Sequence, residues 1–184
     1  DALTANANQE IWVYQLPAID DQFDLTTGDE IPFAPLAAGT FRQVTDTAPS
    51  RTLLATVTLP DVIDDNRDAT ISDDGNTIAF ISTRNLVPGV GNADFNPELF
   101  FCRTTNGFAP GSNTFAQGTA TQDAVVGPKT FNRFQSNPSL SFDGNVVAFL
   151  STANLAASND DDGSGHGNEE VYVADFSGSG LTNI

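Results

Sequence analysis

Residues 138–155, PSLSFDGNVVAFLSTANL, repeat residues 69–86, ATISDDGNTIAFISTRNL, at an offset of 69 positions and without a gap. Ten of the 18 aligned positions are identical, and four more differ conservatively. A long internal repeat of this kind is the signature of an architecture that stacks copies of one structural unit. We therefore interpret the chain as a series of similar units.

Each copy contains an Asp-Gly pair between two apolar runs, at residues 74–75 and 143–144. Such a pair predicts a tight hairpin turn, because glycine readily adopts the positive φ that the turn needs. The runs that follow, 77–82 (TIAFIS) and 146–151 (VVAFLS), are apolar at both odd and even positions. We expect both runs to be inner strands buried on both faces, which places each sheet between two similar sheets.

A second signature, Asn-x-Glu followed by an aromatic-rich strand, occurs at residues 8–10, 96–98 and 168–170. A short Thr-containing segment follows each strand, at residues 41–46, 118–123 and 180–184. One unit therefore reads as four strands, as in the blade of a β-propeller. The Asn and Glu side chains either form a repeated ligand or bond loop backbone at the start of the third strand. Their recurrence in every unit favours the structural interpretation.

The string S-x-D-G-x-x-(I/V)-A-F-x-S-x-x-N-L, followed by Asn-x-Glu and an aromatic strand, resembles the TolB-like propeller repeat, also called the PD40 or WD40-like repeat. The resemblance implies an all-β chain of antiparallel four-stranded blades. We expect about two and a half blades of a larger ring, since closed propellers have four to eight. They comprise a partial blade over residues 1–46 and blades over residues 69–123 and 138–184.

The same resemblance implies a non-catalytic scaffold that is secreted, periplasmic or on the cell surface. Its expected partners are other proteins or further blades of the same propeller. The insertions at 16–38, 104–117 and 156–168 are expected to project from one partner-binding surface. Two alternatives stay open. The chain is the gating propeller of a prolyl-oligopeptidase-like or tricorn-like serine peptidase with its catalytic domain elsewhere, or it is a subunit of an extracellular assembly.

The composition and the absence of catalytic motifs argue against several classes of function. The net charge of −17, from 24 acidic and seven basic residues, argues against binding a nucleic-acid backbone. No apolar run is long enough to predict a membrane span. No G-x-S-x-G motif is present, and the single histidine, His166, lies in a Gly-rich loop that would position a general base poorly, so we expect no enzymatic activity. The lone cysteine, Cys102, is expected to be buried and unreactive in a strand.

The acidic loop at residues 158–169, SNDDDGSGHGNE, approaches the spacing of an EF-hand calcium loop. The candidate ligands are Ser158, Asp160, Asp162, the Ser164 carbonyl and Glu169. The first place is Ser rather than Asp, and no helix is expected before the loop. Two interpretations therefore remain, a Ca²⁺ site particular to this unit or a solvated acidic turn.

Overall fold

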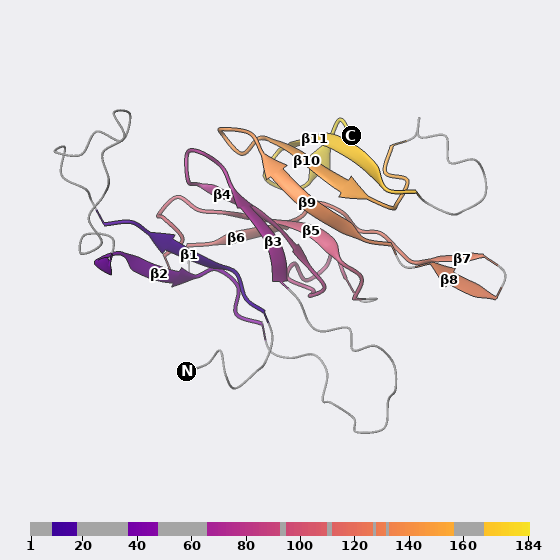
Figure 1. The fold of residues 1–184 in the computed structure, drawn as a ribbon, viewed down its shortest axis with the longest axis horizontal. Helices are drawn as coiled ribbons and strands as arrows, with labels where there is room; N and C mark the ends of the chain where they lie inside the picture. Colours follow the sequence, from indigo (N-terminus) through magenta and orange to yellow (C-terminus); the bar gives the residue numbers. More distant parts are fainter. Residues whose placement is uncertain are drawn as a thin grey trace, which may run out of the picture.

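The computed structural model describes residues 9–17, 37–47, 66–92, 95–109, 112–126, 128–131, 133–156 and 168–184. Within these residues every element is a β-strand, and every strand pair is antiparallel. The all-β architecture expected from the repeat is therefore confirmed. Figure 1 shows the sheets layered in chain order.

Three sheets and one hairpin make up the described chain. The first sheet pairs β1 (Trp12–Gln15) with β2 (Thr40–Gln43). The second sheet contains β3 (Asn66–Ile71), β4 (Thr77–Ser82), β5 (Glu98–Arg103) and β6 (Thr114–Gln117), paired in chain order. The third sheet contains β9 (Gln135–Leu140), β10 (Val146–Ser151), β11 (Glu170–Phe176) and β12 (Leu181–Thr182), also in chain order. The separate hairpin joins β7 (Ala124–Val126) to β8 (Lys129–Phe131).

Both predicted Asp-Gly turns are present. Gly75 has φ 71° and Gly144 has φ 66°, the left-handed conformation that favours glycine. Their N–H groups donate to the carbonyls of Ser72 and Ser141, at 2.8 and 3.0 Å. Within the first turn, hydrogen bonds from the Ser72 hydroxyl and then from Asn76 hold the pKa of the Asp74 carboxyl below its ordinary value.

The second sheet is covered on both faces, as predicted for β4. One cluster of buried side chains fills the space between the first and second sheets: Ile11, Val44, Ile78, Phe80, Phe100, Cys102 and Phe108. Another fills the space between the second and third sheets: Ala79, Ile81, Leu99, Phe101, Ala116, Val147, Phe149, Tyr172, Ala174 and Phe176. Successive residues of β4 thus enter opposite cores. Phe80 of β4 and Phe149 of β10 occupy equivalent positions in the two cores.

The prediction for residues 146–151 is only half right. β10 is an inner strand, with Val147 and Phe149 buried, but Ala148 and Leu150 on its other face are only partly buried. On the neighbouring strand, Val171 and Val173 are 70% and 57% exposed. Among the described residues, the third sheet has a packed neighbour on one side only, and this explains the difference from β4.

The fourth strand of the second unit also differs from expectation. β6 (Thr114–Gln117) precedes the predicted segment 118–123, so the loop after β5 is shorter than the predicted excursion 104–117. The first strands begin at Asn66 and Gln135, three residues before the predicted starts. Residues 124–137, which lie between the two predicted blades, contain the β7–β8 hairpin.

The three predicted insertions do not start from one surface. Gln15, at the end of β1, lies beside Gly107 in the loop after β5, so the segments at 16–38 and 104–117 leave from the same end of the sheets. β10 runs in the opposite direction to β5 and ends at Ser151, beside Gln135 at the start of β9. The segment at 156–168 therefore follows a strand that ends at the opposite end of the sheets from the end of β5. The antiparallel order of the strands enforces this separation.

Cys102 is completely buried in β5, as expected. Burial raises the pKa of its thiol to about 12, so the reactive thiolate is scarce at neutral pH.

Replacement of Phe149 by alanine tests the core between the second and third sheets. We expect Phe149→Ala to lower the free energy of unfolding by about 3–5 kcal/mol, the usual cost of truncating a buried aromatic residue. Phe142→Ala is the matched control, because Phe142 is exposed in the neighbouring turn and should change stability by less than about 0.5 kcal/mol. Urea unfolding of both variants measures the difference. A loss below about 1 kcal/mol at Phe149 would show that it is not a core residue.

Candidate functional site

The most developed polar cluster surrounds Glu98, the Glu of the second Asn-x-Glu signature. Its carboxylate, which is buried at the start of β5, accepts hydrogen bonds from the hydroxyls of Thr119 and Thr121 and from the Thr121 N–H. The Thr119 hydroxyl also accepts from the Leu99 N–H at 2.9 Å. Asn96 donates to the Thr121 carbonyl at 2.8 Å. The Thr-containing segment after β6 is therefore tied to the start of β5.

Glu10 repeats this arrangement in the first sheet. Its carboxylate accepts from the Thr45 hydroxyl at 2.5 Å, the Thr47 hydroxyl at 2.7 Å and the Thr47 N–H at 2.8 Å. The Thr45 hydroxyl accepts from the Ile11 N–H at 2.8 Å, as Thr119 does from Leu99. One geometry thus occurs twice, with Glu and two Thr residues in the same roles.

Each cluster reaches into the next sheet through an amide side chain. Asn66, at the start of β3, donates to the Thr47 hydroxyl and accepts from Ser82 at the end of β4. In the next unit, the Gln135 amide lies within hydrogen-bonding distance of the Thr121 and Ser151 hydroxyls, at 3.3 and 3.4 Å. Glu, Thr-x-Thr, Asn or Gln, and Ser therefore form a polar latch between consecutive sheets. We use the term latch for these two sets of residues.

The latch identifies the role of the Asn-x-Glu signature where it is described. Glu10 and Glu98 bond the backbone and hydroxyls of their own unit, as the structural interpretation predicts. Sequence reasoning missed the Thr pairs, although the pattern Thr-x-Thr is visible at 45–47 and 119–121. It also missed Asn66 and Gln135, because they lie just outside the repeated stretch.

Glu170, the third Glu, has different surroundings. It is only partly buried, and its carboxylate accepts from the side chain of Asn168 in the same loop. The neighbouring Glu169 accepts from the Ser136 hydroxyl at 3.4 Å on the surface. This unit therefore has the Asn-x-Glu signature but not the buried Glu–Thr geometry.

The calcium prediction falls mostly outside the described residues. Ser158, Asp160, Asp162 and Ser164 are not described, nor is His166, and only Glu169 of the candidate ligands is. In the described part of the chain, no three His, Cys, Asp or Glu side chains gather as a metal site would require. The loop at 158–169 remains a prediction.

Arg103 joins the second and third sheets at the end opposite to the latch. Its guanidinium donates to the Gly144 carbonyl at 3.2 Å and to the Asn145 side chain at 2.6 Å, and it lies 4.8 Å from the centre of the Phe176 ring. Gly144 packs so closely on the second sheet that a Cβ there would lie 2.5 Å from the Thr77 side chain. Both ends of this sheet interface are thus held by polar contacts.

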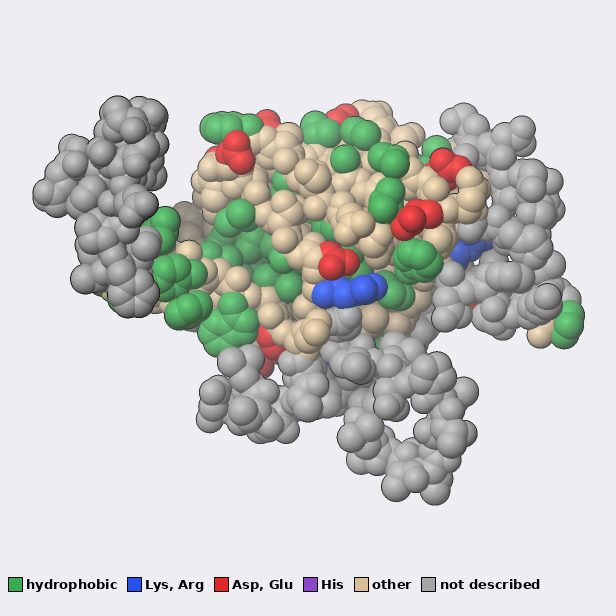
Figure 2. Space-filling model, viewed as in Figure 1, with side chains coloured by type: hydrophobic (Ala, Val, Ile, Leu, Met, Phe, Trp, Pro, Cys, Tyr) green, Lys and Arg blue, Asp and Glu red, His purple; other side chains and the backbone are tan. Residues whose placement is uncertain are grey.

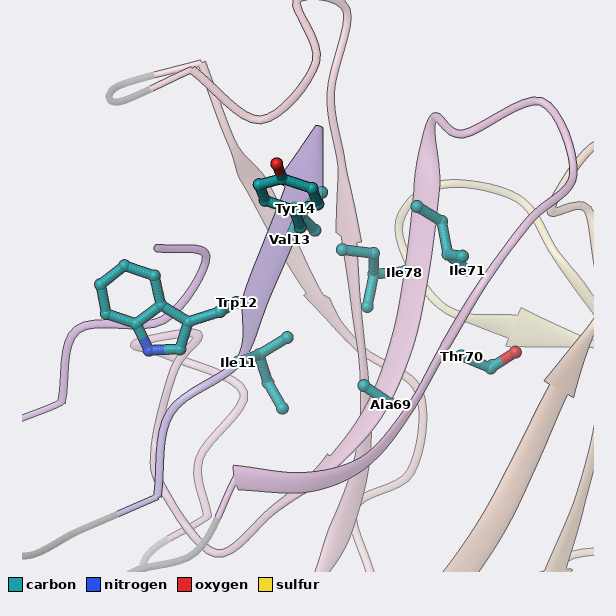
Figure 3. Close-up of a pocket in the computed structure, with 8 residues that line it drawn as sticks. All are labelled: Ile11, Trp12, Val13, Tyr14, Ala69, Thr70, Ile71 and Ile78. Atoms are coloured by element: carbon teal, nitrogen blue, oxygen red, sulfur yellow. The ribbon is translucent and has the colours of Figure 1, made fainter. Parts of the chain in front are cut away.

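A groove of about 260 Å³ lies beside β1, between the first and second sheets. Figure 3 shows β1 on one side of the groove, with Ala69, Ile71 and Ile78 on the other. Its lining residues are Ile11, Trp12, Val13, Tyr14, Ala69, Thr70, Ile71 and Ile78. This lining is mainly apolar, so the groove suits an apolar occupant.

Comparison of the chain with protein-family models, curated proteins and solved structures found no match. The described residues contain no helix of the length and apolar character that a membrane crossing would require. The structure therefore defines an all-β protein of stacked antiparallel sheets, two of them four-stranded.

Glu98→Ala tests whether the latch stabilises the fold. The change would leave the Thr121 N–H and the Thr119 and Thr121 hydroxyls without their acceptor, so we expect a loss of about 2–4 kcal/mol in unfolding free energy. Glu170→Ala removes the same side chain at the equivalent position of the third sheet and should cost less than about 1 kcal/mol, because that carboxylate is partly exposed. Equal losses in the two variants, measured by chemical denaturation, would contradict a structural role specific to the latch.

Proposed function

We propose that the chain is part of a non-catalytic β-propeller scaffold, of the TolB-like kind that its repeat resembles, and that it binds another protein. The resemblance is the support for a secreted, periplasmic or cell-surface location, which is part of the proposal. One observation supports the binding role. The third sheet has an exposed apolar face, and the equivalent face of the second sheet is covered by the third sheet.

Support for propeller blades comes from the repeated geometry. Two four-stranded antiparallel sheets of the same strand order pack face to face, with their strands connected in sequence order. The same latch joins the first sheet to the second and the second to the third. In a propeller, each blade contacts its neighbours through such faces.

Support for a scaffold comes from the use of the repeated polar residues. Glu10 and Glu98 are the Glu residues of the repeated signature in their units. Their carboxylates accept hydrogen bonds from Thr residues of the same unit. Residues with this role maintain the shape of the repeat. We therefore expect a partner to bind surfaces where the units differ in sequence or where a sheet face is exposed.

Support for protein binding comes from the outer face of the third sheet. Val171 and Val173 of β11 correspond to Leu99 and Phe101 of β5. The register shows this correspondence: Val171 pairs with Leu150 and Val173 with Ala148. In the second sheet, Leu99 pairs with Ile81 and Phe101 with Ala79. Leu99 and Phe101 are completely buried against the third sheet. Figure 2 shows hydrophobic side chains over the region of β10 and β11 at the top of the view. Exposed apolar faces of this kind mark interaction surfaces.

The charge of the chain adds a condition on the partner. Asp175 is exposed next to Val173 on the same face of β11, and the whole chain carries a net charge of −17. A partner with an apolar centre and a basic rim would match this surface and would be attracted at long range.

Photo-crosslinking in the source cells tests this role. Benzoylphenylalanine in place of Val173 should form a discrete crosslink to another protein, because this side chain is exposed on the open face of an inner strand. The same replacement at Val90, an exposed residue in the loop after β4, is the matched control and should give none. A crosslink only within the chain, or none at position 173, would contradict protein binding at this face.

A further inference from the structure

Three buried side-chain amides lie at the end of the second sheet where β4 leads into β5. Asn92 belongs to the loop between these strands, Asn96 lies just before β5, and Gln117 is the last residue of β6. These residues are 1%, 5% and 6% exposed. In each, the amide nitrogen is hydrogen-bonded, whereas the amide oxygen is buried and accepts no hydrogen bond from the residues that the structure describes.

The nitrogens of the two Asn side chains hold the loop in shape. The Asn92 nitrogen donates to the Asn96 carbonyl at 3.0 Å. It also donates to the carbonyls of Ser82 and Arg84, both at 3.5 Å, so it joins the two ends of the loop. The Asn96 nitrogen donates to the Thr121 carbonyl at 2.8 Å. The loop is thereby tied to the segment that follows β6.

Gln117 brings the third amide to the same loop. Its nitrogen donates to the Thr119 carbonyl at 2.8 Å and to the carbonyl of Gly91, the neighbour of Asn92, at 3.5 Å. Exchange of the oxygen and nitrogen in any of the three amides would place an oxygen against a backbone carbonyl. Both atoms would be acceptors, so the hydrogen-bond network fixes the orientation of each amide. The oxygens are therefore the atoms that need a donor.

The chemistry of the site favours water over a metal ion. A buried oxygen without a donor has lost its hydrogen bonds to solvent, so nearly all such atoms in proteins are paired with a protein group or an ordered water. A buried water typically makes about three hydrogen bonds to polar groups of this kind. A calcium ion takes about six to eight oxygen ligands. Here the nearby backbone carbonyls already accept from the amide nitrogens, which leaves one oxygen from each amide.

We propose that the loop between β4 and β5 binds buried water molecules as a fixed part of its structure, and that these donate hydrogen bonds to the side-chain oxygens of Asn92, Asn96 and Gln117. A water molecule has only two protons to donate, so more than one molecule is needed for the three oxygens. The water molecules join the loop to the end of β6, beside the latch residue Thr121, to which Asn96 donates. This site is independent of any partner at the third sheet.

A high-resolution crystal structure of the whole protein tests the site directly. Density for ordered water should lie about 2.5–3.0 Å from each of the three amide oxygens. An atom with about six or more oxygen neighbours at about 2.3–2.6 Å would identify a bound cation and would overturn the proposal. Protein groups that donate to all three oxygens would also overturn it, because no bound water would then be needed.

Magnetic relaxation dispersion of the water oxygen nuclei is the second measurement, because it detects only water that stays bound for longer than the protein tumbles. Gln117→Leu removes one of the three oxygens and should reduce the dispersion amplitude. Gln43→Leu is the matched control. Gln43 pairs with Trp12 as Gln117 pairs with Phe100, but it is only partly buried, so its replacement should leave the amplitude unchanged. Circular dichroism verifies that both variants are folded. Equal amplitudes in the unaltered protein and in Gln117→Leu would overturn the proposal.

Discussion

Burial of the second sheet on both of its faces is the constraint on which the rest of this structure depends. β4 sends Ile78 and Phe80 into one core and Ala79 and Ile81 into the other. A sheet with two apolar faces is stable only between two neighbours, because either face alone in water would forfeit the hydrophobic stabilisation. The first and third sheets are therefore as necessary to the second as its own strands.

Apolar burial is not directional, so polar contacts must set how the sheets align. The latch residues Glu98, Thr121 and Gln135 connect the sheets at one end, and Arg103 connects them at the other. Contacts at both ends restrict sliding and rotation of one sheet over the next. Glu170 is only partly buried, and its carboxylate accepts from Asn168 in the same loop.

The repeat predicted the strands and turns well because they depend on local chemistry. The Asp-Gly turns, the inner position of β4 and β10, and the buried Cys102 all follow from residues close in sequence. The exposed face of the third sheet could not be predicted, because β10 has nearly the sequence of β4 and its burial depends on a neighbouring sheet. The fourth strand was misplaced because the conspicuous Thr residues bond a carboxylate and do not belong to the strand itself. The groove beside β1 is lined by residues 11–14 and 69–78, which are far apart in the sequence, so no local sequence pattern records it.

Energetic coupling between the second and third sheets tests the face-to-face arrangement most directly. Phe101 and Phe176 come from different sheets, and their rings stack with centres 3.8 Å apart and planes 10° apart. A double-mutant cycle with Phe101→Leu, Phe176→Leu and the combined variant isolates this contact from the effects of either change alone. The structure requires a coupling of about 0.5–1.5 kcal/mol in unfolding free energy, the range found for aromatic pairs in contact. Additivity within about 0.3 kcal/mol would show that the two rings do not touch and that the sheets do not pack in this way.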